Sequence, residues 1–185
     1  MSAPAVAPVP AGAAVAPAAT RTAALPIAIA VARILMGFYF LWAFIDKTFG
    51  LGFATPAERA WVGGGSPTTG FLTNATTESP FAGVFSALAG NAPVDWLFML
   101  GLLGVGVSLM LGVGVRIGAI AGTAMLLLMY LAEFPLTLTG ATNPLIDSHI
   151  TDISIMAIVF FGVYSQRLSL ARTWRVIVGD KTWLW

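Results

Sequence analysis

The side chains that could carry acid–base chemistry in this chain gather around its single histidine, His149. Asp147 precedes it, and Asp152 follows it three residues later. On a helix, residues three apart share a face, so we expect His149 and Asp152 to lie side by side. A histidine beside a carboxylate can hold a proton near neutral pH, which suits a proton relay to a bound redox compound. The alternative is that these groups satisfy one another and fix the helix register.

A second set of polar residues stands at the ends of other apolar runs. Asp46 and Lys47 close the first run, and Glu133 closes the third. Trp42 could offer a flat apolar wall beside them, although an aromatic residue there more commonly faces lipid or core. We therefore predict a pocket in which His149 and Asp152 are catalytic and five residues bind the ligand: Trp42, Asp46, Lys47, Glu133 and Asp147. No ligand spacing in this set supports a metal site.

The composition excludes several kinds of chemistry. Cysteine is absent, so the chain alone cannot carry out thiol–disulfide exchange, hold an iron–sulfur cluster through thiolates or attach haem covalently. One histidine also excludes a bis-His haem or a multi-His metal site made by this chain. The formal net charge is +1, without a basic run that could neutralise a row of phosphates, so no nucleic-acid partner is expected. Redox chemistry would need a bound organic cofactor or another subunit.

Four long apolar runs must position the candidate residues. The chain has 185 residues, of which 58% are hydrophobic and 9% charged, whereas soluble domains carry about 25% charged residues. Each run approaches the roughly 20 residues that cross a hydrocarbon core of about 30 Å. We therefore predict an all-α integral membrane four-helix bundle within a domain of residues 23–165, with spans at residues 27–44, 94–112, 117–133 and 144–164.

The distribution of Lys and Arg predicts the orientation of these spans. If the N-terminus lies inside, the outer side holds only Lys47 and Arg59. Because positively charged segments stay in the cytoplasm, we expect a multi-pass protein of a bacterial cytoplasmic membrane with both termini cytoplasmic. The inner side then holds Arg21, Arg116, Arg167, Arg172, Arg175 and Lys181.

The two terminal segments differ in composition from the bundle. Residues 1–22 form an Ala/Pro-rich run that we expect to be a disordered tail. Residues 166–185 mix apolar, aromatic and basic side chains. That mixture predicts a helix in the inner membrane interface, with Trp183 and Trp185 as further anchors.

The outer connection after Lys47 is too long for a simple turn, so we expect short helices in it. Residues 55–58 (TPAE) form a capping-box pattern with Pro56 at the first helical position, which predicts one short helix. A second is expected at residues 80–88, with Ser79 as its N-cap. These helices would cap the bundle.

Small and charged residues inside the spans indicate how the helices pack. Small residues recur every four positions in the second and third spans, which predicts close packing of these antiparallel neighbours. They are Gly104, Ser108 and Gly112 in one span, and Gly118 and Gly122 in the other. Arg33 lies inside the first span and needs a partner or a task there. We consider Asp152 and the inner headgroups as alternative partners of Arg33.

The order and spacing of several motifs resemble those of the DoxX/DoxD-like family of small four-helix membrane proteins. The resemblance covers about residues 33–164. The motifs that carry it are RILMG (33–37), WAFIDK (42–47), ATPAERAWVGGGSP (54–67), DWLFMLGLLGVG (95–106), GVGVR (112–116) and NPLIDSH (143–149).

This resemblance implies a function in electron transfer. DoxD-like proteins are the membrane subunit of thiosulfate:quinone oxidoreductase, and other relatives are linked to redox complexes. We therefore expect a membrane subunit of a redox complex, surrounded by lipid, with a non-covalent quinone as cofactor and a partner protein subunit. The lack of cysteine fits such a partner better than a complete sulfur-handling enzyme. The alternative is a non-catalytic scaffold or assembly factor, and a homo-oligomer is compatible with both.

Overall fold

The computed structural model describes residues 18–165 and 167–185, and all regular elements in these ranges are helical. Six α-helices are joined by short 3₁₀ turns and one π-helix. The α-helices are α1 (Ala18–Phe49), α2 (Ala82–Leu88), α3 (Ala92–Leu111), α4 (Val115–Ala132), α5 (Ser148–Phe161) and α6 (Ala171–Val178). The shorter elements are η1 (Ala57–Arg59), η2 (Trp61–Gly63), the π-helix η3 (Phe71–Ala75), η4 (Gly162–Ser165) and η5 (Thr182–Leu184).

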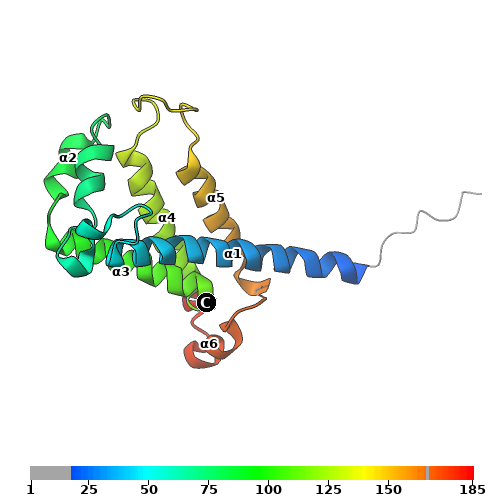
Figure 1. Ribbon diagram of the computed structural model, residues 1–185. Coiled ribbons are helices and arrows are strands. Elements are labelled where there is room, and N and C mark those ends of the chain that lie inside the picture. The colour runs from blue at the N-terminus through cyan, green and yellow to red at the C-terminus, as the bar shows by residue number, and fades with distance from the viewer. Residues whose placement is uncertain (1–17, 166) are drawn as a thin grey trace, which may run out of the picture.

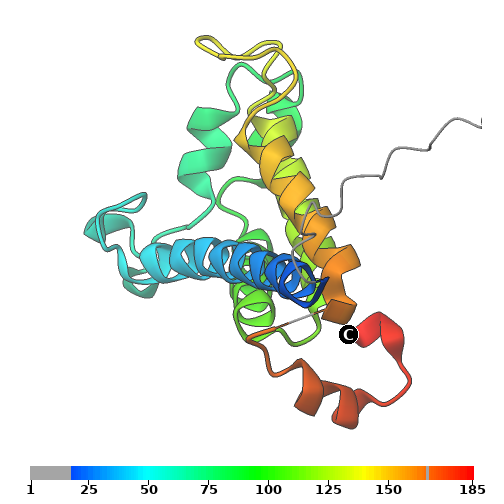
Figure 2. The same cartoon turned by 90° about the vertical axis from the view of Figure 1, so that its right-hand side faces the viewer.

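The four long helices form two pairs. α1 packs along α3 and α4 packs along α5, and the pairs are joined by contacts of α3 with α4 and of α1 with α5. Figures 1 and 2 show that the two pairs cross rather than run parallel to one another. The apolar core lies where all four helices meet, and its fully buried members include Met99, Leu126 and Met156. The fold is therefore an all-helical bundle, as the sequence predicts.

Three helices, α1, α3 and α4, are long and apolar enough to cross a membrane. Their bounds match the first three predicted spans, although α1 already begins at Ala18, inside the tail expected over residues 1–22. The rest of that tail, residues 1–17, lies outside the described residues. The fourth helix is shorter than predicted, because α5 begins at Ser148 and its apolar stretch ends at Tyr164. Residues before Ser148 follow a turn in which the Asn143 side chain accepts from the Leu145 and Ile146 amides.

Glycines in left-handed conformations end α3 and start α4. Gly112 is the C-cap of α3 with φ 70°, and Gly114 is the N-cap of α4 with φ 60°. Only glycine adopts this conformation without steric cost, which explains the tight reversal between the two helices. The predicted turn at residues 112–116 is confirmed.

Close packing of the helices depends on most of the predicted small residues but not on Gly104. A Cβ atom at Gly104 would meet nothing within 4 Å, so this residue does not face a neighbouring helix. A Cβ atom at Gly106 would instead lie 2.8 Å from the backbone nitrogen of Leu41 in α1. Gly118 does pack as predicted, because a Cβ atom there would clash with the Ser108 hydroxyl. The prediction from the four-residue spacing is thus confirmed at Gly118 and Gly122 and wrong at Gly104.

The outer connection differs in detail from the predicted short helices. η1 has Pro56 as its N-cap, without a side-chain cap from Thr55, and spans only one 3₁₀ turn. α2 starts at Ala82 with Phe81 as its N-cap. The Ser79 hydroxyl accepts from the Phe81 amide and donates to the carbonyl of Leu131 at 2.7 Å, so it ties this connection to α4 instead of capping α2.

Arg33 is wholly buried, and no ion pair joins it to Asp152 among the described residues. Its guanidinium donates to the carbonyls of Leu109 and Met110 at the end of α3 and, at 2.8 Å, to that of Leu168. The last carbonyls of a helix lack intrahelical partners, and a cation is favourable beside them. The predicted pairing of Arg33 with Asp152 is therefore wrong, whereas the alternative that Arg33 reaches toward the inner headgroups stays a prediction.

Candidate functional site

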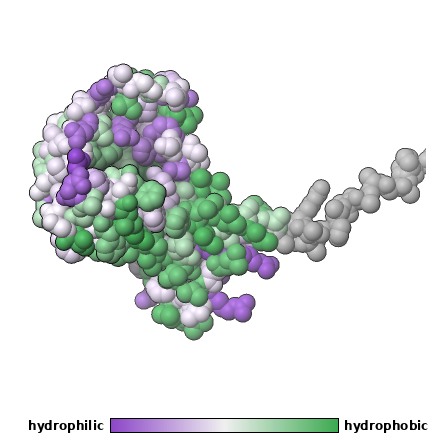
Figure 3. Space-filling model, in the orientation of Figure 1, coloured by the Kyte–Doolittle hydropathy of each residue, from purple (hydrophilic) through white to green (hydrophobic). Residues whose placement is uncertain are grey.

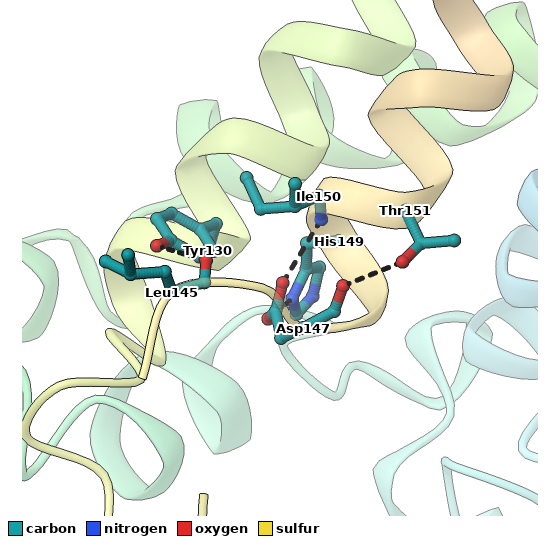
Figure 4. A network of polar contacts seen from close by, with 6 residues as sticks. All are labelled: Tyr130, Leu145, Asp147, His149, Ile150 and Thr151. Atoms are coloured by element: carbon teal, nitrogen blue, oxygen red, sulfur yellow. Dashed lines mark hydrogen bonds and ion pairs between the residues drawn. The ribbon is translucent and has the colours of Figure 1, made fainter. Parts of the chain in front are cut away.

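His149 is buried at the start of α5 and is held by the residue that caps this helix. The Nδ1 atom of His149 lies 2.6 Å from Oδ2 of Asp147. The other carboxylate oxygen, Oδ1, accepts from the amide of Ile150 and makes Asp147 the N-cap of α5. Figure 4 shows the Asp147 carboxylate beside the imidazole of His149, with its bond to the Ile150 amide drawn as a dashed line. One carboxylate therefore both starts the helix and orients the imidazole ring.

A cavity of about 380 Å³ opens beside this pair, at the connection between α4 and α5. Its ionisable lining residues are Glu133, Asp147 and His149. Glu133 is the C-cap residue of α4, so the end of one helix and the start of the next bring the three groups together. The connection supplies the rest of the lining, which includes Thr142, Asn143 and Ile146. The hydroxyl of Tyr130 on α4 donates to the carbonyl of Leu145 at 2.9 Å and holds this connection against the helix.

Asp152 does not pair with His149 as predicted. No hydrogen bond joins Asp152 to another residue in the described parts of the chain, and the imidazole of His149 pairs with Asp147 instead. The reason is geometric: the residue before a helix can fold its side chain back over the first turn. The charge of Asp152 still interacts electrostatically with both His149 and Asp147.

Tyr39 on α1 belongs to the same electrostatic environment, although it is not among the candidate site residues predicted from the sequence. The charges of Asp152 and Glu133 both act on its hydroxyl. The signal that could have found it is weak, because Tyr39 stands in an aromatic run between Phe38 and Phe40. Which member of such a run faces α5 depends on the rotation of α1.

Asp46, Lys47 and Trp42 are not among the residues that line the cavity. Asp46 is buried and accepts from the backbone amides of Phe53 and Ala54, which fixes the chain after α1. Lys47 lies 6.0 Å from the ring centroid of Phe98, and Trp42 packs edge-on against Phe53. The predicted outer cluster is thus divided between the α1–α3 side and the α4–α5 side.

Asp95 is a second structural carboxylate that the sequence analysis did not single out. It is buried at the start of α3 and accepts from the hydroxyls of Ser66, at 2.9 Å, and Thr68, at 2.5 Å. Asp46 and Asp95 therefore anchor the two parts of one long outer connection. The run of Ser and Thr at residues 66–69 is the sequence signal for such an acceptor.

The arrangement at His149 can hold and pass a proton. If Nδ1–H donates to Asp147, the free Nε2 atom accepts in the neutral imidazole and donates in the charged one. No hydrogen-bond partner of Nε2 is found within the described ranges, and the residue lines the cavity. Over the same ranges, no group of three or more His, Asp or Glu side chains could share a metal ion. The site therefore presents one oriented imidazole and one further carboxylate to any occupant of the cavity.

Comparisons with known protein families, curated proteins and solved structures give no match for this chain.

Proposed function

We propose that the chain is a multi-pass membrane subunit of a redox complex and that it binds the head of a quinone in the cavity beside His149. In this proposal α5 with η4 is a fourth span, and both termini are cytoplasmic. The cavity then lies at the outer end of the bundle. The exclusion of thiolate and bis-His centres means that electrons reach the cavity from a partner subunit.

The observation that carries this proposal is the oriented, buried imidazole at a cavity wall. Nδ1 of the buried His149 is held by a carboxylate, and the residue lines the cavity, so its other ring nitrogen is left for a ligand in this proposal. The cavity volume of about 380 Å³ falls within the range of about 300–1,000 Å³ typical of small-molecule sites. Its mixed lining suits a flat ring with polar oxygens.

The residues present fit a quinone head. In the charged imidazolium form, Nε2–H of His149 would donate to a carbonyl oxygen of the ring, and Asp147 would keep the imidazole in one orientation. Ile146 and Leu138 would contact the apolar part of the head. A bound quinone would supply the capacity to take up two electrons and two protons. Glu133 would exchange protons between the cavity and the outer solution.

The test is photolabelling of the full chain in nanodiscs with a short-chain photoreactive benzoquinone. We expect the label on residues 133–149. His149→Gln keeps a polar side chain but removes the imidazole, and we expect it to lower labelling at least about tenfold, the effect of losing about 1.4 kcal/mol. Ser86→Ala is the matched control, because Ser86 is an exposed polar residue of α2 that does not line the cavity.

Two outcomes would contradict the quinone assignment. Labelling that is spread over lipid-facing residues would show partition of the probe into the bilayer. Equal labelling of His149→Gln and Ser86→Ala would show that the imidazole does not contact the probe.

A scaffold is the second candidate, and the ordered outer connection favours it. Asp46 and Asp95 fix this connection through backbone and hydroxyl donors, yet Phe53 and Val62 on it remain 76% and 68% exposed. A fixed surface with exposed apolar residues suits a partner protein. This function predicts that Asp95→Ala abolishes co-purification of the partner while quinone labelling stays unchanged.

A further inference from the structure

The C-terminal segment, residues 167–185, is joined to the bundle by arginines from three helices. Arg33 of α1 donates to Leu168, as described above. Arg116 at the start of α4 donates from its backbone amide to Trp185 and from its guanidinium to the Thr182 carbonyl, both at 2.8 Å. Arg175 of α6 donates to the Val163 carbonyl at 2.7 Å. These contacts hold the segment in one orientation across the end of the bundle, as Figures 1 and 2 show.

Several large apolar side chains of the C-terminal segment remain uncovered. Val176 is 81% exposed, Ile177 71% and Leu168 70%. Trp174 and Trp185, by contrast, are partly covered, and the Trp174 indole donates to the Leu184 carbonyl at 2.6 Å. Because the segment is fixed, these apolar side chains cannot turn inward. Side chains this exposed are stable at the boundary between headgroups and acyl chains.

The charges around these side chains divide into two kinds. Arg116 and Arg175 are engaged internally, since each also lies over an aromatic ring, Tyr164 at 5.0 Å and Trp185 at 4.5 Å. Arg167, Arg172 and Lys181 are exposed, and the only exposed acidic residue of the segment is Asp180. Figure 3 shows hydrophilic residues beside apolar ones at this end of the molecule. The exposed charge is therefore positive and complementary to an anionic lipid headgroup.

We propose that the C-terminal segment is a binding surface for anionic phospholipids of the inner leaflet, with Val176 and Ile177 in the acyl region and Arg172 and Lys181 on the headgroups. The proposal rests on the membrane placement proposed above but not on quinone binding. An interfacial position alone would not specify the lipid. The exposed Arg172 and Lys181 favour a negatively charged headgroup, whereas Arg116 and Arg175 have a structural role.

Native mass spectrometry of the chain released from bilayers of equal phosphatidylglycerol and phosphatidylcholine tests this proposal. The wild type should retain phosphatidylglycerol in preference. Arg172→Gln should weaken that retention by up to about fivefold, which corresponds to about 1 kcal/mol for one basic residue near an anionic surface. Arg59→Gln, the same change at an exposed arginine of the opposite end, should leave it unchanged.

Equal retention by the Arg172→Gln and Arg59→Gln variants would overturn the proposal, as would a wild type without lipid preference. Because the chain has no cysteine, Ile177→Cys provides a second measurement at one defined position. A fluorophore there should be quenched by lipids brominated near the headgroup. A disulfide between two copies of the Ile177→Cys variant would instead show that a second copy covers this surface. Absence of the chain from the membrane fraction would contradict both the lipid-binding proposal and the proposed membrane function. Quinone labelling that stays unchanged in Arg172→Gln would show that loss of lipid binding does not affect the quinone site, so the two proposals can fail separately.

Discussion

Arg33 and His149 are both buried ionisable side chains, and they stand at opposite ends of the bundle. Arg33 is surrounded by backbone carbonyls from α3 and from the C-terminal segment. His149 is paired with one carboxylate, that of Asp147, and both residues line a cavity. Burying a polar group costs free energy unless it is hydrogen-bonded, and the two residues offset this cost with different partners.

The difference separates a structural site from a candidate chemical one. At Arg33 the acceptors are main-chain carbonyls at the end of α3 and in the C-terminal segment, so the guanidinium links segments that are distant in sequence. At His149 the single partner is a side chain, and the second ring nitrogen remains available to a ligand. Charge within an apolar helix therefore indicates function only when its partners and its access to a cavity are known.

The largest effect is expected from Arg33→Leu. Carbonyls of Leu109, Met110 and Leu168 would lose their donor, and the C-terminal segment would lose one of its attachments to the end of α3. Unmade hydrogen bonds in a buried site cost about 1–3 kcal/mol each, so we expect a loss of about 3 kcal/mol in the free energy of unfolding. Unfolding in mixed micelles measures it, and hydrogen exchange should rise at residues 167–170.

Arg59→Leu is the matched control for this substitution, since Arg59 is exposed. It should change the free energy of unfolding by no more than about 0.5 kcal/mol. A similar loss in both variants would mean that Arg33 contributes charge rather than specific contacts, and the contrast with His149 would fail.

A smaller loss is expected from Gly37→Ala, which acts on Arg33 indirectly. A Cβ atom at Gly37 would lie 2.6 Å from the amide nitrogen of Met110, so the end of α3 would have to move. Overpacking of this kind costs about 1–3 kcal/mol. The matched substitution is Gly104→Ala, where the added methyl meets nothing within 4 Å. It should stabilise the helix by up to about 1 kcal/mol, and equal effects would contradict the described α1–α3 packing.

The two glycines also show how far the sequence could predict this fold. Hydropathy predicts the long helices, and the glycines at residues 112 and 114 predict the turn between two of them. Both features depend on local composition. The roles of Gly104 and Arg33 depend on how each helix is rotated and on how the helix pairs cross. No local pattern contains that information.

The candidate site was predicted to a similar extent. The closeness of Asp147 and His149 in sequence made their grouping visible, and Glu133 was correctly placed at a helix end. The separation of Asp46 and Lys47 from the cavity was not visible, because Asp46 is bound by amides of its own following loop. The place of Tyr39 near the site, like the exposure of Gly104, depends on how its helix is rotated, which the sequence does not show.

Substitutions of Asp147 can separate its two roles, which are to cap α5 and to orient the imidazole of His149. Asp147→Ala removes the N-cap of α5 and should cost about 1 kcal/mol in the free energy of unfolding. Asp147→Asn retains capping and should be nearly neutral, but it removes the charged acceptor from Nδ1 of His149. With a single histidine in the chain, imidazole ¹⁵N signals report that change directly. Unmoved signals in Asp147→Asn would show that the contact does not orient the ring.

The smallest effect is expected from Asp152→Asn. Asp152 is only partly buried and has no hydrogen-bond partner among the described residues, so the free energy of unfolding should change by no more than about 0.5 kcal/mol. Its charge does interact with His149 and Asp147, so the imidazole signals should still move, by less than in Asp147→Asn. A larger shift in Asp152→Asn than in Asp147→Asn would make Asp152 the principal partner of His149. The charge of Asp152 can outweigh the direct contact of His149 with Asp147, at 2.6 Å, only if the imidazole ring turns away from Asp147.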